Sequence, residues 1–197
     1  MTSSAVFLDR DGVINAAIQT AVGLDSPRHR REFEMLPRVG PAIRTLNALG
    51  MPVVVVSNQP GPAKGKFGVD ELEAMTALMK AQLEESDARV DGVYYCLHHP
   101  DAVVGAYRVT CNCRKPKPGL LVQASSELGL DLRSSYMVGD QSRDMLAGKA
   151  VGCKTILVGA APDADAVTHA DHVQRDLPSA VTLILELETL NPAARRR

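Results

Sequence analysis

Short apolar runs alternate along this chain with longer stretches of helical periodicity. The apolar runs predict strands over residues 5–8, 52–56, 92–95, 135–138 and 154–158, with a weaker strand at 172–173. The stretches between them predict helices over residues 39–49, 69–85, 118–128, 144–151 and 179–187. The strands are continuously apolar, as expected for strands that are buried on both faces of a sheet. The alternation therefore predicts a three-layer α/β sandwich around a mostly parallel sheet.

The length and the charge balance narrow the possible functions. With 197 residues the chain can form one sizeable core, so we expect one domain over residues 1–190 and a basic tail over 191–197. Lys and Arg number 22 against 23 Asp and Glu, which leaves no broad positive field for nucleic acid. No apolar run is long enough to span a bilayer, and the first residues lack the features of a secretory signal. We therefore expect a cytoplasmic monomer that acts on a small molecule, with neither nucleic acid nor membrane as a partner.

Two carboxylates directly follow the first predicted strand. Asp9 and Asp11 flank Arg10, and Gly12 after them permits a sharp bend of the backbone. Such a pair can hold a hard divalent cation, and one carboxylate can attack phosphorus while the other manages protons. Asp and Gly are also common turn residues, so a solvated turn explains this motif alone equally well.

Three further polar motifs lie where predicted elements end or begin. Ser57 ends the second strand, where its hydroxyl could donate to a phosphoryl oxygen or only form a turn. Lys115 precedes a helix, where it could neutralise a phosphate or belong to a solvated basic loop. Asp140 follows the fourth strand and suits Mg²⁺ or a helix cap, while Asp144 is a candidate cap or supporting anchor. Open parallel sheets place their sites at the carboxyl ends of the strands, so we expect these side chains to converge.

A polar loop over residues 96–113 carries a metal-binding pattern. Its four candidate ligands are Cys96, His98, Cys111 and Cys113. Three thiolates and one imidazole form a closed tetrahedral set for Zn²⁺, so we predict a structural and not a catalytic zinc. His99 is the alternative to His98 as fourth ligand, and buried free cysteines are the alternative to a metal site. Cys153 leads a predicted strand and is assigned to the core.

The ordered motifs resemble a known superfamily. Asp9-x-Asp11-Gly12, Ser57, Lys115 and Gly139-Asp140 with Asp144 are similar to the four signature motifs of the haloacid dehalogenase phosphatases. The resemblance implies a Rossmann-like fold and hydrolysis through an aspartyl phosphate on Asp9, with Asp11 as general acid and then base. It implies that Ser57 and Lys115 bind the transferring phosphoryl group. It also implies that Mg²⁺ is held by the Asp9 side chain, the Asp11 backbone carbonyl and Asp140.

The cysteine loop, which runs directly into Arg114 and Lys115, is similar to that of a narrower group. This group contains the D-glycero-D-manno-heptose 1,7-bisphosphate 7-phosphatases and the related histidinol-phosphate phosphatases. The resemblance implies a small sugar bisphosphate that loses its 7-phosphate, with histidinol phosphate or another small phosphomonoester as the alternative. It also implies four substrate contacts, from Asn58, Gln59, Arg114 and Gln141. A zinc-stabilised binding module without catalysis is the remaining alternative.

The distances between the motifs leave no room for a separate cap domain. We therefore expect an open site, rimmed by residues 16–37 and by the predicted zinc loop. Residues 16–37 lack the Asp-x-Gly-Tyr segment of the heptose enzymes, so the sequence leaves the physiological substrate and its anomer open.

Overall fold

A six-stranded parallel sheet forms the centre of the computed structural model, which describes residues 3–21, 23–160, 162 and 164–190. The strands lie in the order β5-β4-β1-β6-β7-β8. Their bounds are β1 (Val6–Leu8), β4 (Val53–Asn58), β5 (Gly92–Cys96), β6 (Tyr136–Gly139), β7 (Lys154–Val158) and β8 (His172–Gln174). The predicted strands and the predicted fold class are confirmed. The predicted basic tail, residues 191–197, lies outside the described residues.

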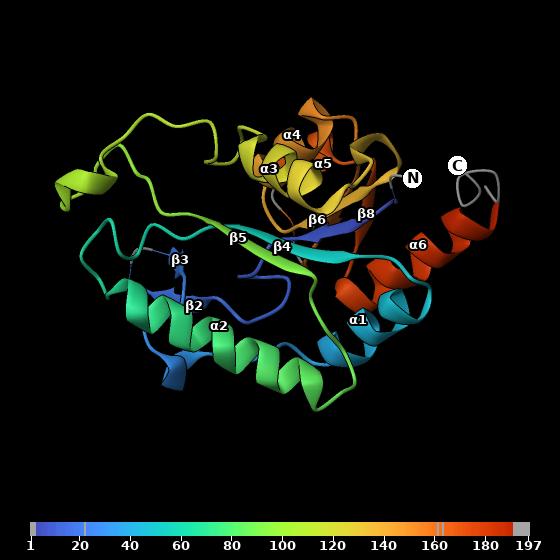
Figure 1. The fold of residues 1–197 in the computed structure, drawn as a ribbon, viewed down its shortest axis with the longest axis horizontal. Coiled ribbons are helices and arrows are strands. Elements are labelled where there is room, and N and C mark those ends of the chain that lie inside the picture. The colour runs from blue at the N-terminus through green and yellow to red at the C-terminus, as the bar shows by residue number, and fades with distance from the viewer. Residues whose placement is uncertain (1–2, 22, 161, 163, 191–197) are drawn as a thin grey trace.

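Helices cover both faces of this sheet (Figure 1). One face carries α1 (Val39–Ala48), α2 (Val69–Glu84) and α6 (Leu177–Leu190), and the other carries α3 (Gly119–Leu128), α4 (Ser142–Ala150) and α5 (Ala164–His169). Successive residues of a strand point to opposite faces, so Val6 and Leu8 belong to the first core while Ala5 and Phe7 belong to the second. Cys153 is buried in the second core, as predicted. None of the helices in the described part of the chain combines the length and the apolar composition needed to cross a membrane.

The strand register determines where the polar motifs meet. Leu8, the last residue of β1, lies opposite Val55 of β4 and Val138 of β6. The residues that follow these positions therefore leave the sheet at the same edge. This edge is the carboxyl end of the three central strands, where open parallel sheets place their ligand sites.

The segment over residues 16–37 is more ordered than its sequence suggests. Two short strands, β2 (Ile18–Thr20) and β3 (Gly23–Asp25), pair antiparallel, and a turn of 3₁₀ helix, η1 (Arg30–Glu32), follows them. The sequence analysis assigned no strand or helix to residues 16–37, so these elements were missed. Each strand has only three residues, which is too short to show a period of two. Asp25, the last residue of β3, lines the cavity described below, so the hairpin contributes to the site.

Smaller differences concern the helices. Helix α6 begins at Leu177 and not at residue 179, and α4 begins at Ser142 and not at Asp144. The short helix α5 was not predicted, because its six residues show too little apolar periodicity. Two further turns of 3₁₀ helix lie at η2 (Gly105–Tyr107), inside the predicted zinc loop, and at η3 (Leu132–Ser134), before β6.

Candidate active site

The carboxyl ends of β1, β4 and β6 open into a cavity of about 420 Å³. Most of the predicted site residues line it: Asp9, Asp11, Ser57, Asn58, Arg114, Asp140 and Gln141. Lys115 and Gln59 are buried behind this wall, in contact with residues that line it. The structure thus brings together segments that are more than 100 residues apart in the sequence.

Lys115 connects two carboxylates at the bottom of the cavity. Its Nζ lies 3.1 Å from Asp9 Oδ1 and 2.6 Å from Asp144 Oδ1, and it donates to the carbonyl of Val56 at 2.8 Å. Burial alone would lower the pKa of Lys115, but Asp144 and Asp9 raise it above its ordinary value. Lys115 is therefore a cation at neutral pH. Asp144 Oδ2 also accepts a hydrogen bond from the backbone N–H of Gln141 at 3.1 Å, so Asp144 is both helix cap and anchor.

Asp140 completes a group of three carboxylates. Asp9, Asp140 and Asp144 each offer an oxygen, and these oxygens all lie within 4.8 Å of one another. Burial and the nearby charges of Asp9 and Asp144 raise the pKa of Asp140 to about 7. Asp140 Oδ1 is buried without a hydrogen-bond partner in the described part of the chain. An acidic cluster with an unpartnered oxygen fits a hard divalent cation such as Mg²⁺.

Gly12 lets the chain pass close to this cluster. Its φ of 83° lies in the left-handed region, and a Cβ at this position would lie 2.3 Å from Asp140 Oδ2. Any other residue would collide with the proposed metal ligand, which explains why a glycine follows the Asp pair.

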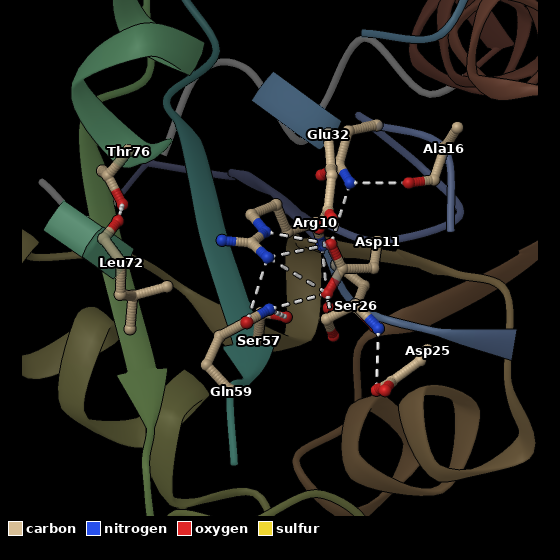
Figure 2. Close-up of polar contacts among 12 residues, drawn as sticks. Arg10, Asp11, Ala16, Asp25, Ser26, Glu32, Ser57, Gln59, Leu72 and Thr76 are labelled. Atoms are coloured by element: carbon tan, nitrogen blue, oxygen red, sulfur yellow. Dashed lines mark hydrogen bonds and ion pairs between the residues drawn. The ribbon is translucent and has the colours of Figure 1, made fainter. Parts of the chain in front are cut away.

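The carboxylate of Asp11 is held by a network of donors that the sequence did not reveal (Figure 2). Oδ1 accepts hydrogen bonds from Arg10 Nη2 at 3.0 Å and Asn15 Nδ2 at 2.9 Å. Oδ2 accepts from Gln59 Nε2 at 2.8 Å and Ser26 Oγ at 2.7 Å. Burial alone would raise the pKa of Asp11, but Arg10 and these hydrogen bonds lower it below its ordinary value. Asp11 is therefore ionised at neutral pH in this arrangement.

The two amides that follow Ser57 form hydrogen bonds within the protein. Asn58 pairs with the backbone of Lys115, since its Nδ2 donates to the carbonyl at 3.0 Å and its Oδ1 accepts from the N–H at 3.0 Å. Gln59 is fully buried, and its Nε2 also donates to Ser57 Oγ at 3.1 Å. Gln59 therefore positions Asp11 and Ser57, and its predicted contact with substrate stays a prediction.

The predicted zinc ligands form a compact cluster. Cys96 Sγ lies 3.7 Å from Cys111 Sγ and 3.3 Å from Cys113 Sγ, and His98 Nδ1 lies 3.3 Å from Cys113 Sγ. A tetrahedral zinc site with Zn–S bonds of about 2.3 Å has ligand separations of about 3.8 Å, so this donor set fits zinc. His99 is not in the cluster, because its Nδ1 accepts a hydrogen bond from the N–H of Asp101. Burial opposes ionisation of Cys111, but hydrogen bonds led by that with Cys113 lower its pKa to about 7.

Several residues of the site were missed by the sequence reasoning. They are Arg10, Asn15 and Ser26 around Asp11, and Asp25, Lys64 and Arg143 on the cavity wall. Arg10 offered a signal, since it is a cation between two acids directly after a buried strand. The others lie in loops, at the end of β3 or at a helix start, and only their neighbours in space reveal their place.

Comparison with known proteins identifies the family. A D-glycero-beta-D-manno-heptose-1,7-bisphosphate 7-phosphatase of Salmonella typhi is 42% identical over 183 residues, which cover 90% of this chain and 94% of that protein. The chain belongs to this phosphatase family. The enzyme of the same name from Escherichia coli K12 is 41% identical over 183 residues, or 90% of this chain and 93% of its own. The HAD-hydrolase-like family model matches residues 112–180.

Solved structures agree with this assignment. A HAD-like phosphatase of Mesorhizobium loti has a TM-score of 0.80 and 38% identity, over 96% of this chain and 88% of its own. A D,D-heptose 1,7-bisphosphate phosphatase of B. bronchiseptica, complexed with magnesium and phosphate, has a TM-score of 0.77 and 29% identity. The match covers 93% of this chain and 98% of that protein. The predictions of a haloacid dehalogenase-like fold and of a phosphoric monoester hydrolase are confirmed.

Proposed function

We propose that this protein removes the 7-phosphate from D-glycero-β-D-manno-heptose 1,7-bisphosphate through an aspartyl phosphate on Asp9, with Mg²⁺ as cofactor. Relatives of this name are about 40% identical over about 90% of the chain, which supports the substrate. The observation that carries the chemistry is the contact of Asp9 Oδ1 with Lys115 Nζ, 3.1 Å apart at the wall of the cavity. A phosphate monoester and a carboxylate repel each other, so attack requires a cation at this place.

The reaction has two steps, transfer of the phosphoryl group to Asp9 and hydrolysis of the aspartyl phosphate, and the cavity side chains act in both. Arg10 N–H and Lys115 Nζ both bind Oδ1 of Asp9, which leaves Oδ2 to attack phosphorus. The phosphorus–oxygen bond to the sugar breaks, and the leaving oxygen takes a proton from Asp11. Asp11 is ionised in the free protein, so this step requires that the negative charge of the bound phosphate raises its pKa and that Asp11 takes up a proton when the substrate binds. Asp11 then takes a proton from water, whose oxygen attacks the same phosphorus and releases phosphate and Asp9. Ser57 Oγ, which accepts from Gln59, keeps its own hydrogen free to donate to a phosphoryl oxygen.

Asp9 and Asp140 would hold the magnesium ion, with the Asp11 backbone carbonyl as the third protein ligand that the family resemblance implies. When bound, the ion supplies positive charge that neutralises the phosphoryl oxygens and the Asp9 carboxylate. Asp144 lies behind them and pairs with Lys115, so it holds the lysine and not the substrate.

The predicted zinc site and the predicted open cleft complete the proposal. Zinc on Cys96, His98, Cys111 and Cys113 would fix the loop that ends in Arg114 and Lys115. The described residues between β1 and β4 form the hairpin, η1 and α1 and no further helix or strand, which supports an active site without a separate cap domain. A cytoplasmic monomer without nucleic-acid or membrane partners is in keeping with the balanced charge.

Phosphate release from a panel of phosphorylated metabolites with Mg²⁺ tests the proposal. We expect the heptose 1,7-bisphosphate to give the highest kcat/KM, and the β anomer to exceed the α anomer. Preference for histidinol phosphate would instead support the second candidate function, which the shared zinc loop keeps open. The Asp9→Asn variant is the control, since it keeps the fold but loses turnover; steady-state activity in this variant would refute the role of Asp9.

A further inference from the structure

Three basic side chains lie on the cavity wall without a close ion pair in the described part of the chain. Lys64 comes from the loop after β4, Arg114 from the end of the zinc loop and Arg143 from the first turn of α4. Within the described residues none of the three forms an ion pair. They approach the same cavity from three separate elements, so they surround a common space.

The acidic side chains on the same wall are already neutralised or belong to the metal cluster. The ion pairs are Asp9 with Lys115, Asp11 with Arg10, and Asp25 with Lys66 and Arg28. Asp140 remains, and it is the proposed magnesium ligand. The cavity therefore carries positive charge beyond what its own acids balance.

The zinc loop positions two of these cations. Arg114 Nη1 donates to the carbonyl of His98 at 3.2 Å. Lys64 follows Ala63, whose carbonyl accepts a hydrogen bond from the N–H of Val103, in the zinc loop, at 2.9 Å. Like charges are thus held together in the absence of a counter-ion, which is the arrangement of an anion site.

Three amide side chains that the family resemblance implied as substrate contacts form hydrogen bonds within the protein instead. Gln141 Nε2 donates to Asp140 Oδ2, Asn58 pairs with the backbone of Lys115, and Gln59 Nε2 donates to Asp11 Oδ2. The groups free to bind the far end of a substrate are therefore cationic, which favours an anion over a hydroxyl group.

We propose that Arg143 and Lys64, together with Arg114, bind the second phosphate of a bisphosphate substrate. This inference rests on the proposed function, because the first phosphate must lie on Asp9. Neither Arg143 nor Lys64 belongs to the phosphatase motifs. The same cations disfavour histidinol phosphate, whose far end carries a protonated amine in place of an anion.

A matched pair of substrates tests this proposal. D-glycero-D-manno-heptose 1,7-bisphosphate and heptose 7-phosphate differ only in the phosphate on C1, so their kcat/KM ratio isolates its contribution. We expect Arg143→Gln and Lys64→Gln each to lower this ratio about tenfold, because each removes one charged contact to phosphate. Lys80→Gln removes the same charge from an exposed site on α2, outside the cavity wall, and leaves the ratio unchanged. Equal losses on both substrates, or no loss on either, would overturn the assignment.

Binding measured in the Asp9→Asn background separates this inference from the proposed function. Calorimetry then gives Kd for both heptose phosphates without turnover. The inference is supported if Asp9→Asn/Arg143→Gln binds the bisphosphate more weakly than Asp9→Asn does, while the Kd of the monophosphate changes less. This result supports the inference even if the unaltered protein turns over another ester faster. If the unaltered protein hydrolyses the heptose bisphosphate but the two Kd values change equally in the double variant, the inference is rejected and the proposed function stands.

Discussion

The bottom and the rim of the cavity are built in different ways. The bottom consists of Asp9, Ser57, Lys115, Asp140 and Asp144. The rim consists of Ser26, Lys64, Arg114 and Arg143. Asp9, Ser57, Lys115 and Asp144 are at most 3% exposed, while Lys64 and Arg143 are exposed. In the bottom, Asp9, Ser57 and Asp140 lie at the ends of buried strands, and Lys115 and Asp144 are buried against them from a loop and from the first turn of α4. The rim comes from loops and from a helix start.

This difference separates the chemistry from the choice of substrate. Strand ends are fixed by the register of the sheet and by packing on both faces, so the reacting groups are preorganised. The rim is held by the cluster of predicted zinc ligands and by ion pairs, such as that of Asp25 on the hairpin with Lys66. We therefore expect changes at the bottom to abolish turnover on every ester, and changes at the rim to alter which ester is preferred.

Lys115→Met gives the largest expected effect. It removes the cation between Asp9 and Asp144, so we expect kcat to fall at least about 1000-fold on all phosphomonoesters. It also leaves two buried carboxylates facing each other, which costs about 3–5 kcal/mol in the free energy of unfolding. Phosphate release and urea denaturation measure the two effects.

A double variant separates the role of Lys115 in catalysis from its role in stability. Lys115→Met/Asp144→Asn removes one of the unpaired carboxylates, so it regains part of the lost free energy of unfolding but none of the activity. Recovery of both together would mean that Lys115 acts only by stabilising the fold.

Loss of zinc gives the next largest effect and tests the support of the rim. Cys111→Ser is expected to lose the bound zinc and to lower kcat/KM about 100-fold, since misplacing Arg114 and Lys115 by about 1 Å can cost this much. Zinc stoichiometry from elemental analysis, thermal denaturation and phosphate release measure the outcome. Cys153→Ala is the control, because Cys153 is a buried cysteine that is not among the four clustered ligands. A zinc-free protein with full activity would contradict this role.

The bottom of the cavity could be predicted from the sequence because local signals define it. Continuous apolar runs marked the strands, and acidic, hydroxyl or basic residues followed directly where the runs end. Asp9, Ser57 and Asp140 could therefore be placed at a common edge before the register was known. The four zinc ligands were also apparent, because their residue types and spacing are unusual for a core.

The sequence placed the rim in residues 16–37 and the predicted zinc loop, and the family resemblance implied Arg114. Ser26, Lys64 and Arg143 could not be predicted, because they become functional only through contacts between distant segments. Ser26 donates a hydrogen bond to Asp11 from 15 residues away in the sequence, and Gln59 does so from 48 residues away. A polar residue after a strand can face the substrate or turn inward to a buried carboxylate, and the sequence does not distinguish these outcomes. Arg143 looks like any exposed residue in the first turn of a helix.

Ser26→Ala gives a smaller effect that is specific to Asp11. The hydroxyl of Ser26 donates a hydrogen bond that lowers the pKa of Asp11, so removing it should raise this pKa. Because Asp11 must be ionised to accept a proton from water, the acid limb of the pH profile of kcat moves to higher pH. Ser134→Ala, which removes a hydroxyl in η3, is the control. An unchanged profile would show that Ser26 does not act on Asp11.

The smallest effect is expected at the amino ends of the strands, opposite the active site. There an aspartate outside the wall of the active-site cavity has a similar set of donors. Asp171 accepts hydrogen bonds from Thr155 N and Oγ1, both at 2.8 Å, and its Oδ1 lies 3.1 Å from Lys149 Nζ. Partial burial opposes ionisation, but Thr155 and then Lys149 lower the pKa of Asp171 below its ordinary value. This stabilisation is present above the unfolded pKa of about 4 and is lost as pH falls through the lower folded pKa.

Asp171→Asn should therefore lower the free energy of unfolding by about 1 kcal/mol at neutral pH, and the difference should disappear in acid. Lys149→Gln should cost less, because its ion pair is about 40% exposed and water screens it. Neither variant should change kcat/KM, because both residues lie outside the cavity wall. Urea denaturation between neutral and acidic pH measures the effect. A larger loss in Lys149→Gln than in Asp171→Asn would show that the ion pair, and not Thr155, holds this edge. A change in kcat/KM would mean that the two edges of the sheet are coupled, so that polar contacts far from the bottom and the rim also determine turnover.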